Sequence, residues 1–168
     1  MQFLAGMLFG AAMCCYMPAC ADERDSLPFS AYPAQKIYKG KHASVLLDTR
    51  EKRNFRTRLR ESMAYPVAFA GEYVVVAWGC GSSCGQGAVV NARTGQVVFL
   101  PGTFSGWMHD SPSIEYRIDS RLMVLRGSIN EKEPHGVHFY RLSGNHFKLI
   151  RHIPFERYPD LQQKEPEK

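Results

Sequence analysis

Hydrophobic and polar positions alternate between residues 72 and 152 with the period of two that is typical of β-strands. This part of the chain is rich in β-branched and aromatic residues, and short runs containing glycine, asparagine, aspartate or serine interrupt the pattern. The sequence therefore predicts a series of strands joined by tight turns. The predicted strands cover residues 72–78, 86–91, 96–100, 114–118, 121–126, 137–142 and 146–152, and a further short strand is predicted over 43–47.

Three connections are short enough to be hairpin turns, at 92–95, 119–120 and 143–145. Gly95 can supply the positive φ that a tight turn needs. Short turns without helical crossovers imply antiparallel pairing. We therefore predict a mainly β fold with one N-terminal helix (α+β), built as an antiparallel meander of hairpins in a single domain. The strand over 72–78 is hydrophobic along its whole length, which predicts a central position in the sheet.

A helical pattern precedes the strands. Asp48 is predicted to be the N-cap, Glu51 gives a capping-box-like pair with it, and Pro66 prevents continuation. Apolar residues recur between these signals at every fourth position, which places them in one narrow stripe. The sequence predicts a helix over 48–63 whose stripe packs on one face of the sheet. The stripe consists of Phe55, Leu59 and Met63.

A helix turns by about 100° per residue, and this rotation places several basic side chains next to one another along one flank of that stripe. Such a ridge could dock an anionic partner. The alternative is a solvated face whose long stems cover apolar surface. Arg53, Arg56 and Arg60 are therefore candidate binding residues, together with the neighbouring Lys52.

The first residues have the features of an export signal. An apolar run over 3–13 is shorter than the about 20 residues of a membrane span, and Ala19-Cys20-Ala21 has the form of a cleavage site. We expect a signal peptide over 1–21, a single β-rich domain over 22–158 and a polar tail over 159–168. The mature protein would be periplasmic or secreted. The alternative is a lipoprotein anchored through Cys20.

The net charge of +5 is a mild basic excess, and the predicted signal segment contributes no Asp, Glu, Lys or Arg to it. Such a surface suits an acidic protein or an anionic envelope polymer as partner. The short ridge and the lack of an RNA-binding aromatic motif argue against nucleic acid. The chain has no glycine-rich phosphate loop, zinc-binding His-Glu-x-x-His helix or serine elbow, and we predict no cofactor and no metal.

Cys80 and Cys84 are the two cysteines, of five, that lie beyond the predicted signal peptide. They stand in a glycine-rich segment of an exported chain, which favours a disulfide-closed loop exposed at the end of the 72–78 strand. Two alternatives remain. A metal site would need His109, His135 or His138 to converge on the sulfurs. A catalytic thiol would need a nearby base, for which His109 with Asp110 is the candidate.

Two further segments carry candidate binding residues. Ser82 and Ser83 lie inside the cysteine loop, and Trp107 and His109 lie in the long connection over 101–112. The alternative for that connection is a lid whose aromatic residues cap the core. His135 and His138 are three positions apart on a predicted strand, so we expect them to face opposite sides as unrelated surface or edge residues.

The chain resembles an uncharacterised group of small exported bacterial proteins. The resemblance rests on Phe-Ala-Gly-x-Tyr at 69–73, Trp-Gly-Cys-Gly-x-x-Cys at 78–84 and the Thr-Gly turn at 94–95, and it covers roughly residues 36–152. It implies export and a β-rich fold, and no activity.

We predict a small binding protein that recognises another protein through the disulfide-closed loop, as an inhibitor or immunity-type factor would. A rigid loop loses little entropy on binding. The alternative is a cysteine-dependent hydrolase or redox enzyme using Cys80 or Cys84. A third hypothesis is a structural envelope component whose basic ridge rests on anionic polymer.

Overall fold

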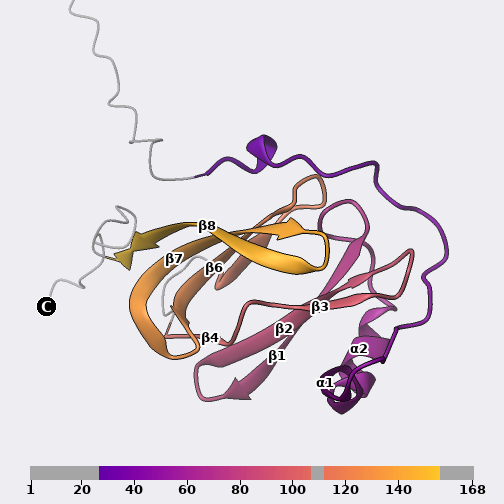
Figure 1. The fold of residues 1–168 in the computed structure, drawn as a ribbon, viewed down its shortest axis with the longest axis horizontal. Helices are drawn as coiled ribbons and strands as arrows, with labels where there is room; N and C mark the ends of the chain where they lie inside the picture. Colours follow the sequence, from indigo (N-terminus) through magenta and orange to yellow (C-terminus); the bar gives the residue numbers. More distant parts are fainter. Residues whose placement is uncertain (1–26, 107–111, 156–168) are drawn as a thin grey trace, which may run out of the picture.

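The computed structural model describes residues 27–106 and 112–155, and its main feature is an eight-stranded antiparallel sheet (Figure 1). The predicted mainly β, antiparallel fold is therefore confirmed. The strands are β1 (Tyr73–Gly81), β2 (Cys84–Asn91), β3 (Val97–Phe99), β4 (Phe104–Ser105), β5 (Ile114–Tyr116), β6 (Leu122–Ile129), β7 (Lys132–Ser143) and β8 (His146–Pro154).

The sheet has two halves joined by its shortest strand. The strand order is β1-β2-β4-β6-β7-β8, while β3 also pairs with β2 and β5 also pairs with β6. Phe104 and Ser105 of β4 pair with the start of β2 on one side and with the end of β6 on the other. We call β1–β3 the first half and β5–β8 the second half. The connection through β4 was not predicted, because two residues carry no periodicity.

The strand predicted to be central, over 72–78, lies instead at the border of the described sheet, because β2 is the one described strand that pairs with β1. Its continuous hydrophobicity has a different cause, which is that both of its faces are covered. Val75 packs against the cluster between the two halves, whereas Val76 and Trp78 pack against the cluster beneath the helices. A run of apolar residues thus reports coverage of the two faces rather than hydrogen bonding at both edges.

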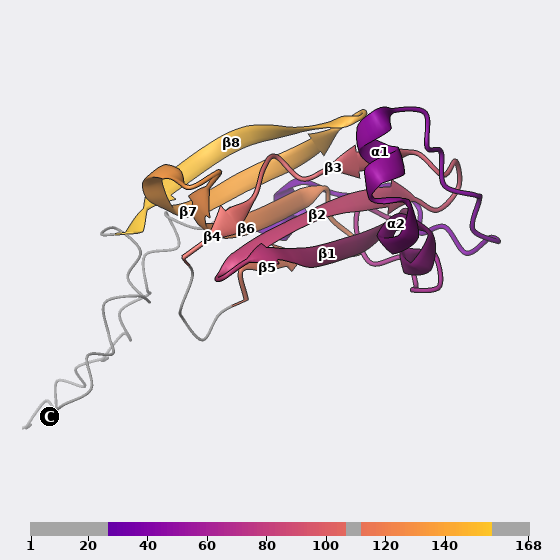
Figure 2. The same cartoon turned by 90° about the horizontal axis from the view of Figure 1, so that it is seen from below.

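The largest core cluster lies between the two halves, around the fully buried Phe69. Val89 of the first half and Met123 of the second half both belong to it. Two smaller clusters cover the outer faces: α2 packs on the first half, and the N-terminal segment packs on the second half through Leu27 and Phe29. The molecule is therefore layered, with the halves of one sheet on either side of a common core (Figure 2).

The predicted helix over 48–63 forms two helices, α1 (Arg50–Asn54) and α2 (Arg56–Ser62), with a break at Phe55. The N-cap is Thr49 rather than Asp48, since the Thr49 hydroxyl accepts a hydrogen bond from the Lys52 amide at 3.2 Å. Asp48 instead forms an ion pair with the Lys52 side chain at 2.7 Å. The Lys52 ammonium holds the pKa of the Asp48 carboxyl below its usual value.

The expected apolar stripe does pack on the sheet. Leu59 is fully buried, and Phe55 and Met63 are partly buried against the same cluster. None of the helices in the described residues is long and apolar enough to span a membrane.

The N-terminal segment over 27–47, which we call the strap, runs along both halves of the sheet (Figure 1). It contains one short 3-10 helix, η1 (Phe29–Ala31). Residues 43–47 are not a strand, contrary to prediction. They are extended and bond to the turn between β2 and β3, where Ala43 N donates to Ala92 O and Leu46 N donates to Gly95 O, both at 2.8 Å. Gly95 has φ +76°, and a Cβ there would overlap the Ser44 carbonyl oxygen.

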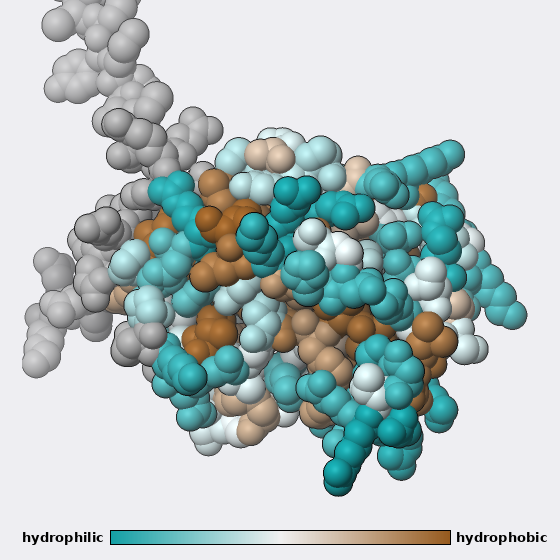
Figure 3. Space-filling model, in the orientation of Figure 1, coloured by the Kyte–Doolittle hydropathy of each residue, from teal (hydrophilic) through white to brown (hydrophobic). Residues whose placement is uncertain are grey.

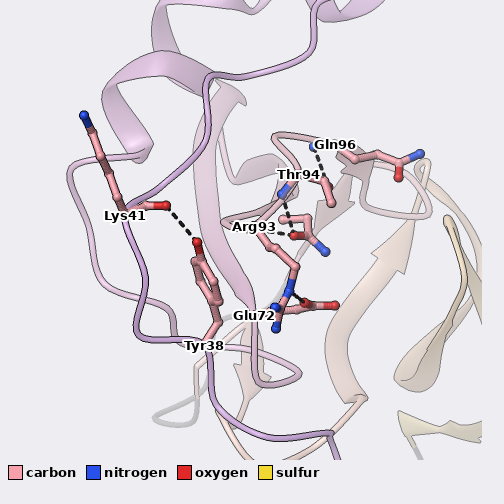
Figure 4. Close-up of polar contacts among 7 residues, drawn as sticks. Tyr38, Lys41, Glu72, Arg93, Thr94 and Gln96 are labelled. Atoms are coloured by element: carbon pink, nitrogen blue, oxygen red, sulfur yellow. Dashed lines mark hydrogen bonds and ion pairs between the residues drawn. The ribbon is translucent and has the colours of Figure 1, made fainter.

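Side chains also fix the strap to this turn (Figure 4). The Tyr38 hydroxyl donates to Lys41 O at 2.9 Å, and the Arg93 guanidinium lies 4.7 Å from the centre of the Tyr38 ring. Arg93 also donates to the Glu72 carboxylate at 3.1 Å. These contacts stabilise the end of the first half that contains the turn between β2 and β3. The opposite end, which contains the turn between β1 and β2, is stabilised by different contacts.

Candidate functional site

The glycine-rich cysteine segment is the tip of a hairpin. β1 and β2 continue beyond the predicted ends of their strands, pairing Gly79 with Gly85 and Gly81 with Cys84. Ser82 and Ser83 form the turn between them and are exposed, as expected for a tip. Ser83 has φ +53°. The segment is therefore an ordered continuation of the sheet, which the strand pattern did not reveal because glycine has no side chain to alternate.

A disulfide joins Cys80 to Cys84, with the two Cα atoms 5.2 Å apart, so the predicted pairing is confirmed. Cys80 lies in a register shift between Gly79 and Gly81, opposite no residue of β2. The bond thus closes the hairpin across a bulge, where the ladder of the sheet is interrupted. We call residues 77–86 with this bond the clamped hairpin.

A bonded pair offers neither a thiolate nucleophile nor two thiolate ligands. In the parts of the chain that the structure describes, no three His, Cys, Asp or Glu side chains converge as metal ligands. His135 and His138 lie on β7, in the second half of the sheet. The catalytic-thiol and metal hypotheses therefore both require the disulfide to open first.

The inner face of the clamped hairpin borders a hollow of about 570 Å³. Phe104, Ser105, Ser113 and Ile114 form the opposite wall, contributed by β4 and the start of β5. The hairpin itself contributes mainly backbone, because its lining residues are small: Ala77, Gly79, Gly81, Ser83, Cys84 and Gly85, with Trp78 between them. We call this space the hairpin hollow.

Two glycines of the hairpin have different reasons to be glycine. A Cβ at Gly85 would overlap the Phe104 ring, so glycine at this position lets the ring pack against the strand. Among the described residues, a Cβ at Gly79 would meet no atom closer than Cys84 O at 3.9 Å, so none of them fills the side-chain space at this position. The hollow is thus closed off at Phe104 and unfilled at Gly79.

The opposite face of the clamped hairpin rests on the helices. The Phe55 ring lies 4.8 Å from the Trp78 ring, and the Trp78 indole N–H donates to the Gln86 side-chain oxygen at 3.2 Å. Trp78 is two residues before Cys80. The break between α1 and α2 therefore supports the base of the hairpin tip.

Three members of the candidate basic ridge, Arg53, Arg56 and Arg60, are exposed on α1 and α2, whereas Lys52 is mostly covered, and the arginines differ in their contacts. Arg53 donates to the carbonyl oxygens of Leu47 and Asp48, at 3.2 and 3.3 Å, and Arg56 donates to Arg53 O at 3.4 Å. Arg60 borders a separate hollow beside the strap. Figure 3 shows mainly hydrophilic side chains at the lower right, where Figure 1 draws the two helices.

The expectation that His138 is a surface or edge residue was wrong. Its side chain is buried, its Nε2 lies 3.0 Å from Gly127 O, and its ring centre lies 4.5 Å from that of His152 across β7 and β8. A carbonyl oxygen only accepts, so Nε2 donates. Burial lowers the pKa of both histidines and raises that of the neighbouring Tyr140. The cross-strand register brings the pair together, and sequence spacing within one strand could not predict it.

His135 lies with its Nδ1 3.2 Å from the Ser128 hydroxyl and its ring 5.4 Å from Phe155. The remaining candidates fall outside the described residues: Trp107, His109, Asp110 and Cys20, with the predicted signal peptide over 1–21 and the tail over 159–168.

Comparison of the chain with protein-family models, curated proteins and solved structures finds no match. The resemblance to small exported proteins stays a prediction.

Proposed function

We propose that this chain is a small exported binding protein that recognises another protein through the clamped hairpin. The observation that carries the proposal is an exposed two-residue tip, closed by the Cys80–Cys84 disulfide, beside an open hollow. Its action would lie in the periplasm or outside the cell, where such a bond persists. An inhibitor or immunity-type factor is the class of binding protein that this geometry suits.

Rigidity supports this function. A loop that must become ordered on binding loses conformational entropy, at about 0.5–1.5 kcal/mol for each immobilised flexible side chain. The clamped hairpin avoids most of this loss, because its tip holds two serines, glycines and a covalent bond. Trp78 and Phe55 support it from the outer face.

The surroundings of the tip favour a protein over a small molecule. The walls of the hairpin hollow combine backbone groups, three serines and the apolar Phe104 and Ile114, and none of the lining residues that the structure describes is charged. A side chain of a partner could enter the space at Gly79 while backbone groups at the rim accept or donate hydrogen bonds. This is the pattern of an anchored side chain within a polar rim.

The test is quantitative cross-linked capture from an envelope extract, with the oxidised protein as bait. Gly79→Leu should fill the hollow without displacing backbone, and Ser82→Arg should alter the tip alone. Asn145→Leu is the matched control, since Asn145 is exposed in the turn between β7 and β8. We expect both hairpin variants to reduce capture of one partner and the control to retain it.

Equal capture by all the proteins would contradict the proposal. An enzyme would give a different result: a free thiol in the protein as exported, an activity on envelope material, and loss of that activity on alkylation.

A further inference from the structure

The direction of the backbone groups of β1 follows from its first hydrogen bonds. Ala92 N donates to Glu72 O at 2.7 Å, so the Glu72 carbonyl points toward β2. Tyr73 exchanges hydrogen bonds of 2.9 and 3.0 Å with Phe69, on the side away from β2. Successive residues of a strand direct their N–H and C=O groups to alternate sides. The odd-numbered residues of β1 as far as Gly79 therefore direct their backbone N–H and C=O groups away from β2.

Val75, Ala77 and Gly79 are the odd-numbered residues that follow Tyr73. Within residues 27–106 and 112–155, no strand pairs with the side of β1 that faces away from β2. On that side, no backbone group of another described segment forms a hydrogen bond with these three residues. Figures 1 and 2 show β1 as a border strand of the sheet. The border is thus a row of donors and acceptors ready to pair with another strand.

β8, at the opposite end of the strand order, carries protections that β1 lacks. β8 has Lys148, a register shift opposite Phe139 and Tyr140, and Pro154 at its end. Charges, bulges and prolines are the usual means of preventing edge-to-edge pairing. Between residues 75 and 79, β1 has no charge, no proline and no bulge, since its register shift begins only after Gly79. This stretch of the β1 border is therefore open to pairing in a way that β8 is not.

Charge decides between the two possible occupants. Pairing of β1 with β1 of a second copy would keep the same faces aligned and bring two sets of α1 and α2 together. Residues 48–62 contain six basic and three acidic side chains, so two such segments would repel each other. Arg53 and Arg56 flank Phe55, whose ring rests on Trp78 of β1. The basic excess of this segment favours an acidic strand over a second copy as the occupant.

We propose that β1 accepts an extended acidic segment of the partner protein as an additional strand along Val75–Gly79. The inference rests on the proposed function and adds the mode of recognition. Side chains of the added strand alternate between the two faces of the sheet. Apolar side chains would enter the hairpin hollow beside Ala77 and Gly79, and acidic side chains would lie on the helix side. Main-chain hydrogen bonds then supply affinity, and the two faces supply specificity.

The test uses a short synthetic peptide in which glutamate alternates with valine or phenylalanine. A second peptide has lysine in place of glutamate, and a third is N-methylated at alternate residues so that one edge cannot donate. Binding is measured by fluorescence anisotropy on the oxidised protein. Hydrogen exchange gives a second readout. We expect the glutamate peptide to slow exchange of the Val75, Ala77 and Gly79 amides, and the other two peptides to bind about tenfold more weakly.

Ala77→Pro removes one backbone N–H that points away from β2 and forms no hydrogen bond with it. Ala77→Val is the matched control, because it keeps this N–H in a larger residue that favours strands. We expect the proline variant to bind the glutamate peptide with about tenfold lower affinity and the valine variant to retain its affinity. Absence of binding, protection elsewhere than at these amides, unchanged affinity in Ala77→Pro, or a dimer that forms through β1 would each overturn the proposal.

The two proposals fail differently. If Ser82→Arg abolishes capture of a partner while Ala77→Pro leaves it unchanged, the clamped hairpin remains the recognition site and the added strand is wrong. If neither variant changes capture, the proposed function itself is wrong.

Discussion

The hairpins at the two borders of the sheet are stabilised in different ways. The β7–β8 hairpin has bulky side chains along its length, including the His138–His152 pair and Tyr140 on the inner face. The far end of the β1–β2 hairpin has glycine at four positions between 79 and 87 and a covalent bond between its strands. Cross-strand side-chain pairs stabilise a sheet by about 0.2–1 kcal/mol each. Where glycine removes these pairs, the disulfide replaces them.

The difference indicates what each hairpin is for. Cross-strand side-chain pairs occupy the space on the faces of a hairpin, so a hairpin end stabilised by such pairs has no room there for a side chain of a partner. A disulfide holds two strands and leaves the neighbouring faces empty, which is how the hairpin hollow remains open at Gly79. An end that is rigid and unfilled suits binding, whereas the histidine-containing end is occupied by its own packing.

The largest effect should come from the support beneath the first half. Leu59 is fully buried under β1 and β2, and Leu59→Ala should cost about 2–5 kcal/mol of unfolding free energy in a denaturant melt. Leu46→Ala is the matched control, because Leu46 is 49 % exposed, and it should cost much less. A loss well under about 1 kcal/mol for Leu59→Ala would mean that α2 does not support the clamped hairpin.

The next effect concerns the junction between the halves. Gly127 has φ +111°, and a Cβ there would overlap the Ser105 carbonyl oxygen of β4. Gly127→Ala should cost roughly 1–3 kcal/mol and loosen β4. Gly144→Ala is the control for the backbone conformation alone, since Gly144 has φ +56° with no atom within 4 Å of a Cβ. Equal costs in thermal or denaturant melts would show that the contact with β4 contributes nothing.

How much of this could be predicted depends on whether a feature is local. Turns at 92–95 and 143–145 join β2–β3 and β7–β8 as expected, because turn chemistry lies in adjacent residues. The connection between β5 and β6 is longer than the predicted turn at 119–120 and runs over 117–121, where Ser120 bridges to Pro33 of the N-terminal segment. The turn between β6 and β7 was missed. It uses Asn130 and Glu131 at positive φ, and the glutamate gives no turn signal.

Features that depend on distant residues escaped prediction. The border position of β1, the pairing of β4 and the contact of His138 with His152 all require the register between strands. At the candidate site, the cysteine pairing was predictable from the glycine-rich spacing and the expected export of the chain. The hollow was not, because its far wall comes from Phe104 and Ile114.

A smaller effect is expected from the disulfide itself. Cys80→Ser with Cys84→Ser should lower the free energy of unfolding by about 2 kcal/mol or less, because the bond closes a loop of only a few residues. Hydrogen exchange should speed up mainly in residues 79–86. Treatment with a reductant should reproduce the change in the wild type and do nothing to the variant. If exchange speeds up equally in the β1–β2 and β7–β8 hairpins, the disulfide does not act locally in place of side-chain pairs.

The smallest effect should appear as a dependence on pH in the other hairpin. Burial lowers the folded-state pKa of His138 and His152 below the ordinary value of about 6.5. Between the lowered pKa values and 6.5 the unfolded chain binds more protons than the folded one, so stability rises with pH there. The stability is complete above about pH 6.5 and is lost as the pH falls. His152→Phe keeps a ring against His138 without a titrating group and should flatten this dependence in melts from neutral to mildly acidic pH. His146→Phe, at an exposed position of β8, should leave it unchanged. If His146→Phe flattens the profile equally, the acid sensitivity does not come from the buried pair, and the two hairpins do not differ in the way their packing indicates.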